Sequence, residues 1–143
     1  MRVSQLSVFL ENKSGRLADV THALADAGIN IRALSIADTI DYGLLRLIVN
    51  DPPAAKSALV SAGFTVALTE VLAIEVPDKP GGLANIIDIL AEVGINIEYM
   101  YAFVGRSGEH ALVVFRIEKV DEAITILQQK GVRILTGQEL HSL

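Results

Sequence analysis

A chain of 143 residues without cysteine cannot use disulfides, thiolate nucleophiles or cysteine-bound metals, so these classes of protein are excluded. Its 51% hydrophobic and 5% aromatic content predicts a folded protein with an aliphatic core. The formal net charge of −5, with Lys and Arg scattered along the chain, disfavours nucleic-acid binding, and no apolar stretch approaches the roughly 20 residues of a membrane span. Because the N-terminus shows no signal-peptide pattern, we expect a soluble cytoplasmic protein.

The first half of the chain shows the period of two of half-buried strands and the three-to-four spacing of amphipathic helices. The elements expected from this pattern are a strand at 3–10, a helix at 16–27, strands at 29–38 and 42–49 around a corner at 39–41, a helix at 53–62 and a strand at 64–68.

The second half of the chain repeats this order. Residues 69–76 carry no linker composition, so the last strand of the first half is expected to run almost directly into the first strand of the second. The elements expected after it are a helix at 83–93, strands at 95–104 and 109–116 around a corner at 106–108, a helix at 120–130 and a strand at 132–135, with 136–143 as its extension.

The two halves are versions of one sequence. Residues 12–32 and 78–98 share ten of 21 aligned positions, where ordinary composition gives about one or two by chance. We therefore predict two fused modules, at 1–68 and 69–143. Each is an α+β, ferredoxin-like βαββαβ unit, with an antiparallel four-stranded sheet in the order 4-1-3-2 and both helices on one face.

The loop that leads from the first strand into the first helix is the first candidate binding site, at 12–15 and again at 78–81. A helix N-terminus presents unpaired amides that favour an anion such as a carboxylate, and the glycine that ends each loop allows close backbone approach. Alternatively, Asn12, Ser14 and Asp78 only cap or turn the chain. Because the loop occurs twice, we give the binding and the capping interpretations equal weight.

Asn30 and Asn96 form the second candidate pair, each within a Gly-Ile-Asn-Ile tetrapeptide. The alternative is that they satisfy backbone groups in the turn. A helix of 12 residues is about 18 Å long, so each Asn lies far from the loop of its own module. The second strand is a sheet edge, and antiparallel pairing of two such edges would bring the Asn of one module to the loop of the other. We expect two composite pockets.

The two loop, helix and Gly-x-Asn-Ile segments resemble the ACT domain family, and the resemblance covers nearly the whole chain. The loop pattern is Asp or Asn, x, Pro, Gly, x, Leu, and Ser14 stands where the first copy departs from it. The resemblance implies a regulatory protein, similar to freestanding tandem ACT proteins, that is not an enzyme. It implies a small-molecule ligand, an amino acid, at interfaces between modules, with no cofactor and no metal. We expect a homodimer, because exposed strand edges remain to be covered.

The resemblance also implies which residues line the pockets. Backbone amides would hold the ligand α-carboxylate, while Asn oxygens and Asp78 would receive its ammonium group. The implied ligand-binding residues are Asn12, Ser14, Gly15, Arg16, Leu17, Asn30, Ile31, Asp78, Pro80, Gly81, Gly82, Leu83, Asn96 and Ile97.

Two other functions remain open. A regulatory subunit that docks on an amino-acid biosynthetic enzyme, for instance of the acetolactate synthase kind, would use the same modules. A remote alternative is an acylphosphatase-like hydrolase, for which Arg16 and Asn30 fit only superficially, because Gly82 replaces Arg16 in the second copy and no nucleophile with a base is evident. Two other classes of protein with this topology are excluded. RNA-recognition domains would need base-stacking aromatic residues on the central strands, and metal chaperones of this fold would need a Cys pair.

Overall fold

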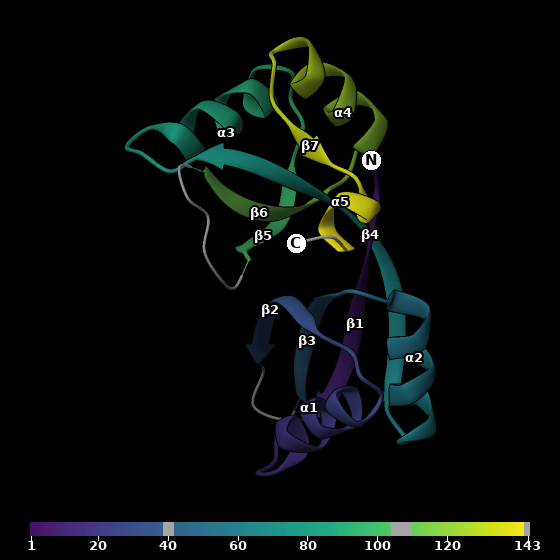
Figure 1. The fold of residues 1–143 in the computed structure, drawn as a ribbon. Helices are drawn as coiled ribbons and strands as arrows, with labels where there is room; N and C mark the ends of the chain where they lie inside the picture. Colours follow the sequence, from purple (N-terminus) through teal and green to yellow (C-terminus); the bar gives the residue numbers. More distant parts are fainter. Residues whose placement is uncertain (39–41, 104–109, 142–143) are drawn as a thin grey trace. The chain divides into compact units, whose positions relative to one another are not determined.

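The computed structural model describes residues 1–38, 42–103 and 110–141 (Figure 1). Contacts divide the chain into two compact units. The N-terminal unit consists of residues 4–69, and the C-terminal unit consists of residues 1–3 together with 70–143. In each unit two long helices cover one face of an antiparallel sheet. The module boundaries expected from the sequence, 1–68 and 69–143, stay a prediction.

The N-terminal unit has the order strand, helix, strand, strand, helix, strand. Its elements are β1 (Val3–Glu11), α1 (Arg16–Asp26), β2 (Ile31–Asp38), β3 (Tyr42–Val49), α2 (Pro52–Ser61) and the first residues of β4 (Thr65–Pro77). The strands lie in the order β2-β3-β1-β4, and the β1–β3 and β2–β3 pairs are antiparallel. This is the 4-1-3-2 order that the sequence predicts.

The core of the N-terminal unit forms because strand and helix each present one apolar face. Leu6, Val8 and Leu10 project from alternate positions of β1, and the α1 residues Val20 and Leu24 pack against them with at most 4% exposure. Complete burial of such a side chain stabilises the fold by about 1.5–3 kcal/mol.

The C-terminal unit repeats the arrangement with one addition. Its elements are the remainder of β4, α3 (Gly82–Glu92), β5 (Ile97–Ala102), β6 (His110–Ile117), α4 (Val120–Gln129), β7 (Ile134–Leu135) and α5 (Gly137–His141). The strands lie in the order β7-β4-β6-β5, again 4-1-3-2, with β4–β6, β4–β7 and β5–β6 antiparallel. In the described residues, no helix is long and apolar enough to cross a membrane.

The strand β4 belongs to both units. It runs without interruption over 13 residues, with Thr65–Thr69 in the N-terminal unit and Glu70–Pro77 in the C-terminal unit. The absence of linker residues at 69–76 predicted a direct passage, and the structure confirms it as one strand. The last strand of one unit and the first strand of the next are therefore a single element.

The expected extension of the last strand over 136–143 is wrong for the described part, because residues 137–141 form α5. A reciprocal capping box starts this helix: the Glu139 amide donates to Thr136 Oγ1 (3.2 Å), and the Thr136 amide donates to Glu139 Oε1 (3.1 Å). The two amides bound in this way are unavailable to a strand partner.

Three strands start later than the sequence predicts. β2, β5 and β7 begin at Ile31, Ile97 and Ile134, each two residues after the predicted start. The preceding residues close the helix: Gly28 and Gly94 have φ of 72° and 71°, and the next amide donates back into the last helical turn in both units. The predicted corners at 39–41 and 106–108 lie outside the described residues.

Replacing Leu90 in α3 tests this account of the core. Leu90 is fully buried between α3 and the sheet, so Leu90→Ala should lower the free energy of unfolding by about 2–5 kcal/mol in urea denaturation. Leu83→Ala is the matched control in the same helix, because Leu83 is 37% exposed and should cost much less. Equal losses for the two variants would contradict the assignment of the core face.

Candidate functional site

The two strand-to-helix loops have the same backbone structure. In each loop, three amide-to-carbonyl hydrogen bonds join corresponding positions. They are Lys13 N to Glu11 O (2.8 Å), Arg16 N to Lys13 O (3.3 Å) and Asp19 N to Gly15 O (2.9 Å) in the N-terminal unit, and Lys79 N to Pro77 O (2.9 Å), Gly82 N to Lys79 O (3.0 Å) and Asn85 N to Gly81 O (3.0 Å) in the C-terminal unit. The substitution of Ser14 for Pro80 leaves this pattern unchanged.

Each loop ends at a glycine in the left-handed conformation. Gly15 and Gly81 have φ of 90° and 85° and directly precede α1 and α3 as their N-cap residues. A glycine has no side chain that could bind the amides of the first turn, which is the usual task of an N-cap residue. The start of both helices therefore presents backbone donors and a partial positive charge at the surface.

Most of the loop residues predicted to bind ligand are accessible. The exposed members are Asn12, Ser14, Gly15, Leu17, Asp78, Pro80, Gly81 and Leu83. Arg16 is half-buried and Gly82 is buried. These exposed residues lie at or next to the starts of α1 and α3, so a small molecule can approach the helix starts from solvent.

Asn30 and Asn96 are exposed and directly precede β2 and β5. The Asn30 amide donates to Asn50 Oδ1 (2.9 Å), and the Asn50 amide donates to the Asn30 carbonyl (3.2 Å). These two bonds use the backbone of Asn30 and not its side-chain amide. Asn50, which sequence reasoning did not single out, is therefore the residue whose side chain holds this turn. Glu118 occupies the corresponding position in the C-terminal unit.

Within each unit the loop and the Asn lie at opposite ends of the first helix. α1 and α3 contain 11 residues each, a length of about 17 Å. The structure thus keeps Asn12 and Asn30 apart within one unit, as expected from the sequence. The meeting of the Asn of one module with the loop of the other stays a prediction, as do the binding roles of Ile31 and Ile97.

The two units differ at the first residue of the helix. A Cβ added to Gly82 would lie 2.0 Å from the Pro77 carbonyl oxygen, because α3 starts directly against the end of β4. The N-terminal unit has Arg16 at this position. Its guanidinium carbon lies 4.9 Å from the centre of the Phe64 ring, and its Nη1 lies 3.5 Å from Asp19 Oδ2. Arg16 is therefore engaged within its own unit.

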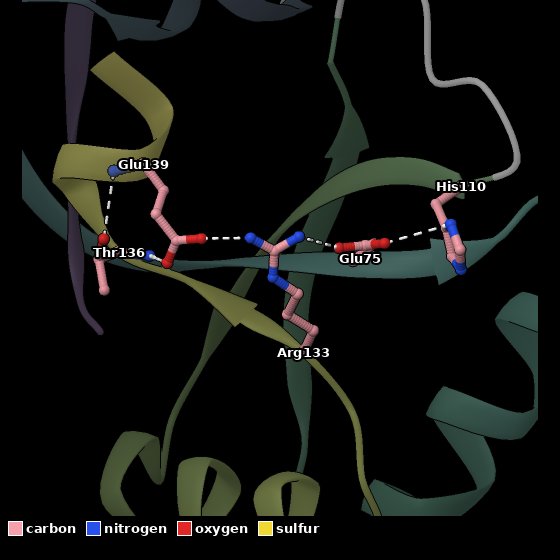
Figure 2. Close-up of polar contacts among 5 residues, drawn as sticks. All are labelled: Glu75, His110, Arg133, Thr136 and Glu139. Atoms are coloured by element: carbon pink, nitrogen blue, oxygen red, sulfur yellow. Dashed lines mark hydrogen bonds and ion pairs between the residues drawn. The ribbon is translucent and has the colours of Figure 1, made fainter. Parts of the chain in front are cut away.

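A polar cluster at one edge of the C-terminal sheet was not found by sequence reasoning (Figure 2). Arg133 Nη1 lies 2.8 Å from Glu75 Oε2, and His110 Nδ1 lies 3.2 Å from Glu75 Oε1. The second Arg133 nitrogen, Nη2, pairs with Glu139. The register that pairs Ile74 with Ile134 places Arg133 beside Glu75. The cluster therefore depends on a strand pairing that no local sequence motif indicates. The described residues hold no group of metal-ligating side chains.

Hydrogen bonding shifts the titration of this cluster. The Thr136 amide and then the Arg133 guanidinium hold the pKa of Glu139 below its ordinary value of 4.5, and Glu139 and Glu75 raise the pKa of Arg133. A lowered carboxylate pKa contributes stability above about pH 4.5 that is lost as the pH falls through the lowered value.

The contact between α3 and β4 predicts the effect of replacing Gly82. Gly82→Ala should destabilise the C-terminal unit, because the new methyl group meets a backbone oxygen that cannot rotate away. Gly137→Ala is the matched control, since Gly137 has open space around it and lies in α5 without positive φ. Thermal unfolding should show a lower Tm for the first variant and not for the second; an unchanged Tm in Gly82→Ala would contradict this geometry.

The capping box predicts a pH dependence. Glu139→Gln removes the charged acceptor, so the stability difference between this variant and the natural protein should be largest near neutral pH. It should shrink as the pH falls below about 4.5, because protonation removes the same charge from the natural protein. Urea unfolding at several pH values measures this difference. A difference that stays constant down to pH 3 would show that the charge of Glu139 is unimportant.

The comparisons with known proteins agree with this structure. The sequence matches the family model described as ACT domain pair over residues 1–143. The structure of protein BT0572 from Bacteroides thetaiotaomicron is 45% identical, with a TM-score of 0.94, over 100% of this chain and 98% of that one. The regulatory subunit of aspartate kinase from Thermus thermophilus, in its ligand-free form, is 19% identical, with a TM-score of 0.63, over 88% of this chain and 91% of that one.

A third structure is that of E. coli aspartokinase III in complex with lysine and aspartate. It is 18% identical, with a TM-score of 0.51, over 90% of this chain and 31% of that one. No protein of curated function matches the sequence. The match over the full length, the repeated βαββαβ order and the duplicated loop lead to one conclusion: the chain belongs to the family of ACT domain pairs.

Proposed function

We propose that this protein is a regulatory sensor that binds an amino acid in pockets formed where two ACT modules pair, with modules at 1–68 and 69–143. The observation that carries this proposal is the duplicated loop. In both units a left-handed glycine opens a helix whose first amides no N-cap side chain occupies, and the surrounding residues are exposed. A single loop of this kind is explained as a structural turn. The presence of two loops with the same hydrogen bonds supports a binding role that both share.

The chemistry of the loop fits the backbone of an amino acid. The amides that follow Arg16 and Gly82 in the first turns of α1 and α3 are donors at the positive end of a helix, which suits an α-carboxylate. The side-chain oxygens of Asn30 and Asn96 and the carboxylate of Asp78 are acceptors that suit an ammonium group. Four apolar residues would border the ligand side chain. These are Leu17, Ile31, Leu83 and Ile97, all exposed or half-buried in the described units.

The remaining loop residues of the proposed pockets differ between the two units. The Arg16 guanidinium already contacts Phe64 and Asp19, and the Arg16 amide donates to the Lys13 carbonyl, so we assign its pocket role to its aliphatic stem. Gly82 has no side chain, and Pro80 stiffens the second loop. Asn12, Ser14, Gly15 and Gly81 complete the two loops. The two proposed pockets therefore have the same backbone structure in their loops and differ in the side chains that line them.

The comparisons support a regulatory role without defining it. Two structures with this fold are described as a regulatory subunit of aspartate kinase and as an aspartokinase in complex with lysine and aspartate. Those descriptions concern enzymes of amino-acid metabolism, which is the context that we propose for this protein, in the cytoplasm. It would act as a homodimer, by a change of assembly or through a partner enzyme, and would itself carry no catalytic residues.

A thermal-shift panel of the twenty amino acids tests the proposal. A bound amino acid at 100 times its Kd should add about 2.7 kcal/mol to the free energy of unfolding, and so raise Tm. Calorimetric titration of the responsive amino acid then gives its stoichiometry. A panel in which no amino acid raises Tm would contradict amino-acid sensing.

Variants of the two asparagines test the composite pockets. Asn30→Ala and Asn96→Ala should each halve the number of amino acids bound per chain, because each removes an acceptor from one of two pockets. Gln129→Ala is the control, since it removes an exposed amide of α4 outside both proposed pockets. Undiminished binding in the double Asn variant would exclude the asparagines from the site, even if the panel gives a ligand.

A further inference from the structure

The C-terminal unit contains a groove of about 310 Å³ that borders one of the proposed amino-acid pockets at Gly82 and otherwise has its own lining. It lies between the start of α3, the end of β4 and the segment that joins α4 to β7. Residues that line it include Gly82, Asn85, Ile89, Lys130, Val132 and Arg133. A volume near 300 Å³ is at the small end of ligand pockets and suits a small metabolite.

The corresponding place in the N-terminal unit is filled by a side chain. Arg16 corresponds to Gly82 and Phe64 corresponds to Val132, and the Arg16 guanidinium lies over the Phe64 ring. The side chain therefore spans the position that the groove occupies in the other unit. Gly82 supplies no such side chain, and its close contact with Pro77 prevents one from being added without a backbone shift.

The residues around the Arg16 side chain in the N-terminal unit and those around the groove in the C-terminal unit favour opposite charges. In the N-terminal unit a carboxylate, Asp19, and an aromatic face receive the guanidinium cation. The C-terminal unit has Asn85 in place of Asp19 and aliphatic Val132 in place of the ring, so both groups that favour a cation are lost. It also has Lys130 where the other unit has Ala62.

The charged groups on the outer wall of the groove pair with one another. The Glu75 side chain, 18% exposed, accepts from Arg133 and lies 3.2 Å from His110 Nδ1, and Arg133 also pairs with Glu139 (Figure 2). Lys130 is different, because it makes no ion pair with any residue of the described ranges. The polar side chains of the lining that take no part in these pairs are Lys130 and Asn85, and Ile86, Ile89 and Val132 form an aliphatic surface beside them.

From these exchanges we infer that the groove of the C-terminal unit binds a small aliphatic carboxylate, in the place that Arg16 fills in the N-terminal unit. The carboxylate is held by the Lys130 ammonium and the Asn85 side-chain amide, and a short branched chain rests on Ile89 and Val132. Every residue of this site belongs to one unit. The site therefore does not depend on pairing between modules, and it shares only Gly82 with a proposed amino-acid pocket.

Three probes of one shape and different charge test the inference: 3-methylbutanoate, 3-methylbutanamide and 3-methylbutylamine. Titration of the full chain followed by NMR should show saturable shifts of the Ile86, Ile89 and Val132 methyl groups with the carboxylate only. An equal response to the neutral amide would show that charge is not recognised, and a preference for the amine would show a cation site. Either result, or no saturable shift with the carboxylate, overturns the inference.

Variants assign the binding to these residues. The double variant Lys130→Ala, Asn85→Asp restores the residues of the N-terminal unit and should weaken carboxylate binding about tenfold or more, the loss expected for a charge-assisted hydrogen bond. Lys119→Ala removes an exposed lysine of the same unit outside the groove and should leave the Kd unchanged. Equal Kd values in the two variants overturn the inference.

The test also separates this site from the proposed sensor function. Asn30→Ala and Asn96→Ala should leave the carboxylate titration unchanged, whether or not they abolish amino-acid binding. If the carboxylate instead loses affinity in those variants, it binds at the composite pockets and the groove is not its site.

Discussion

The structure depends on the passage from strand to helix through a left-handed glycine. A φ near 90° is strained for any residue with a side chain, and glycine takes it at little cost. This conformation at Gly15 and Gly81 turns the chain so that α1 and α3 lie over the sheet within a few residues of the strand end. The same turn leaves the first helical amides at the surface. Core packing and the donors available for a ligand thus follow from one local geometry.

Duplication kept this geometry and changed the side chains around it. The hydrogen bonds of the two loops correspond one to one, although the residue that opens the helix is Arg16 in one unit and Gly82 in the other. Backbone bonds tolerate this exchange, because they do not involve the side chain. The space beside the start of the helix does depend on the side chain at this position. The Arg16 side chain fills this space in the N-terminal unit, whereas a groove of about 310 Å³ remains in the C-terminal unit.

The sequence predicted those parts of the fold that local periodicity encodes. Apolar residues alternate in β1 and recur every three to four residues in α1 and α3, so each of these elements buries one face. Strand and helix patterns in this order are compatible with only a few topologies. The short α5 was missed, although its signal, Thr136 followed by Glu139, is the signature of a capping box. The loop was predicted as a binding loop, but the left-handed conformation of Gly15 and Gly81 and the contact of Gly82 with Pro77 follow from the fold.

The polar cluster and the groove could not be predicted, because both depend on where β7 begins. Its pairing with β4 covers only Ala73 and Ile74, and the Glu75 amide then bonds to the Arg133 carbonyl as the last link of the ladder. Beyond this point β4 continues to Pro77, which has no amide to donate, so a longer β7 could not continue the ladder there. Side-chain pairs from Arg133 replace strand pairing at this edge. The groove opens beside this edge because Gly82 and Val132 are both smaller than Arg16 and Phe64, their counterparts in the N-terminal unit.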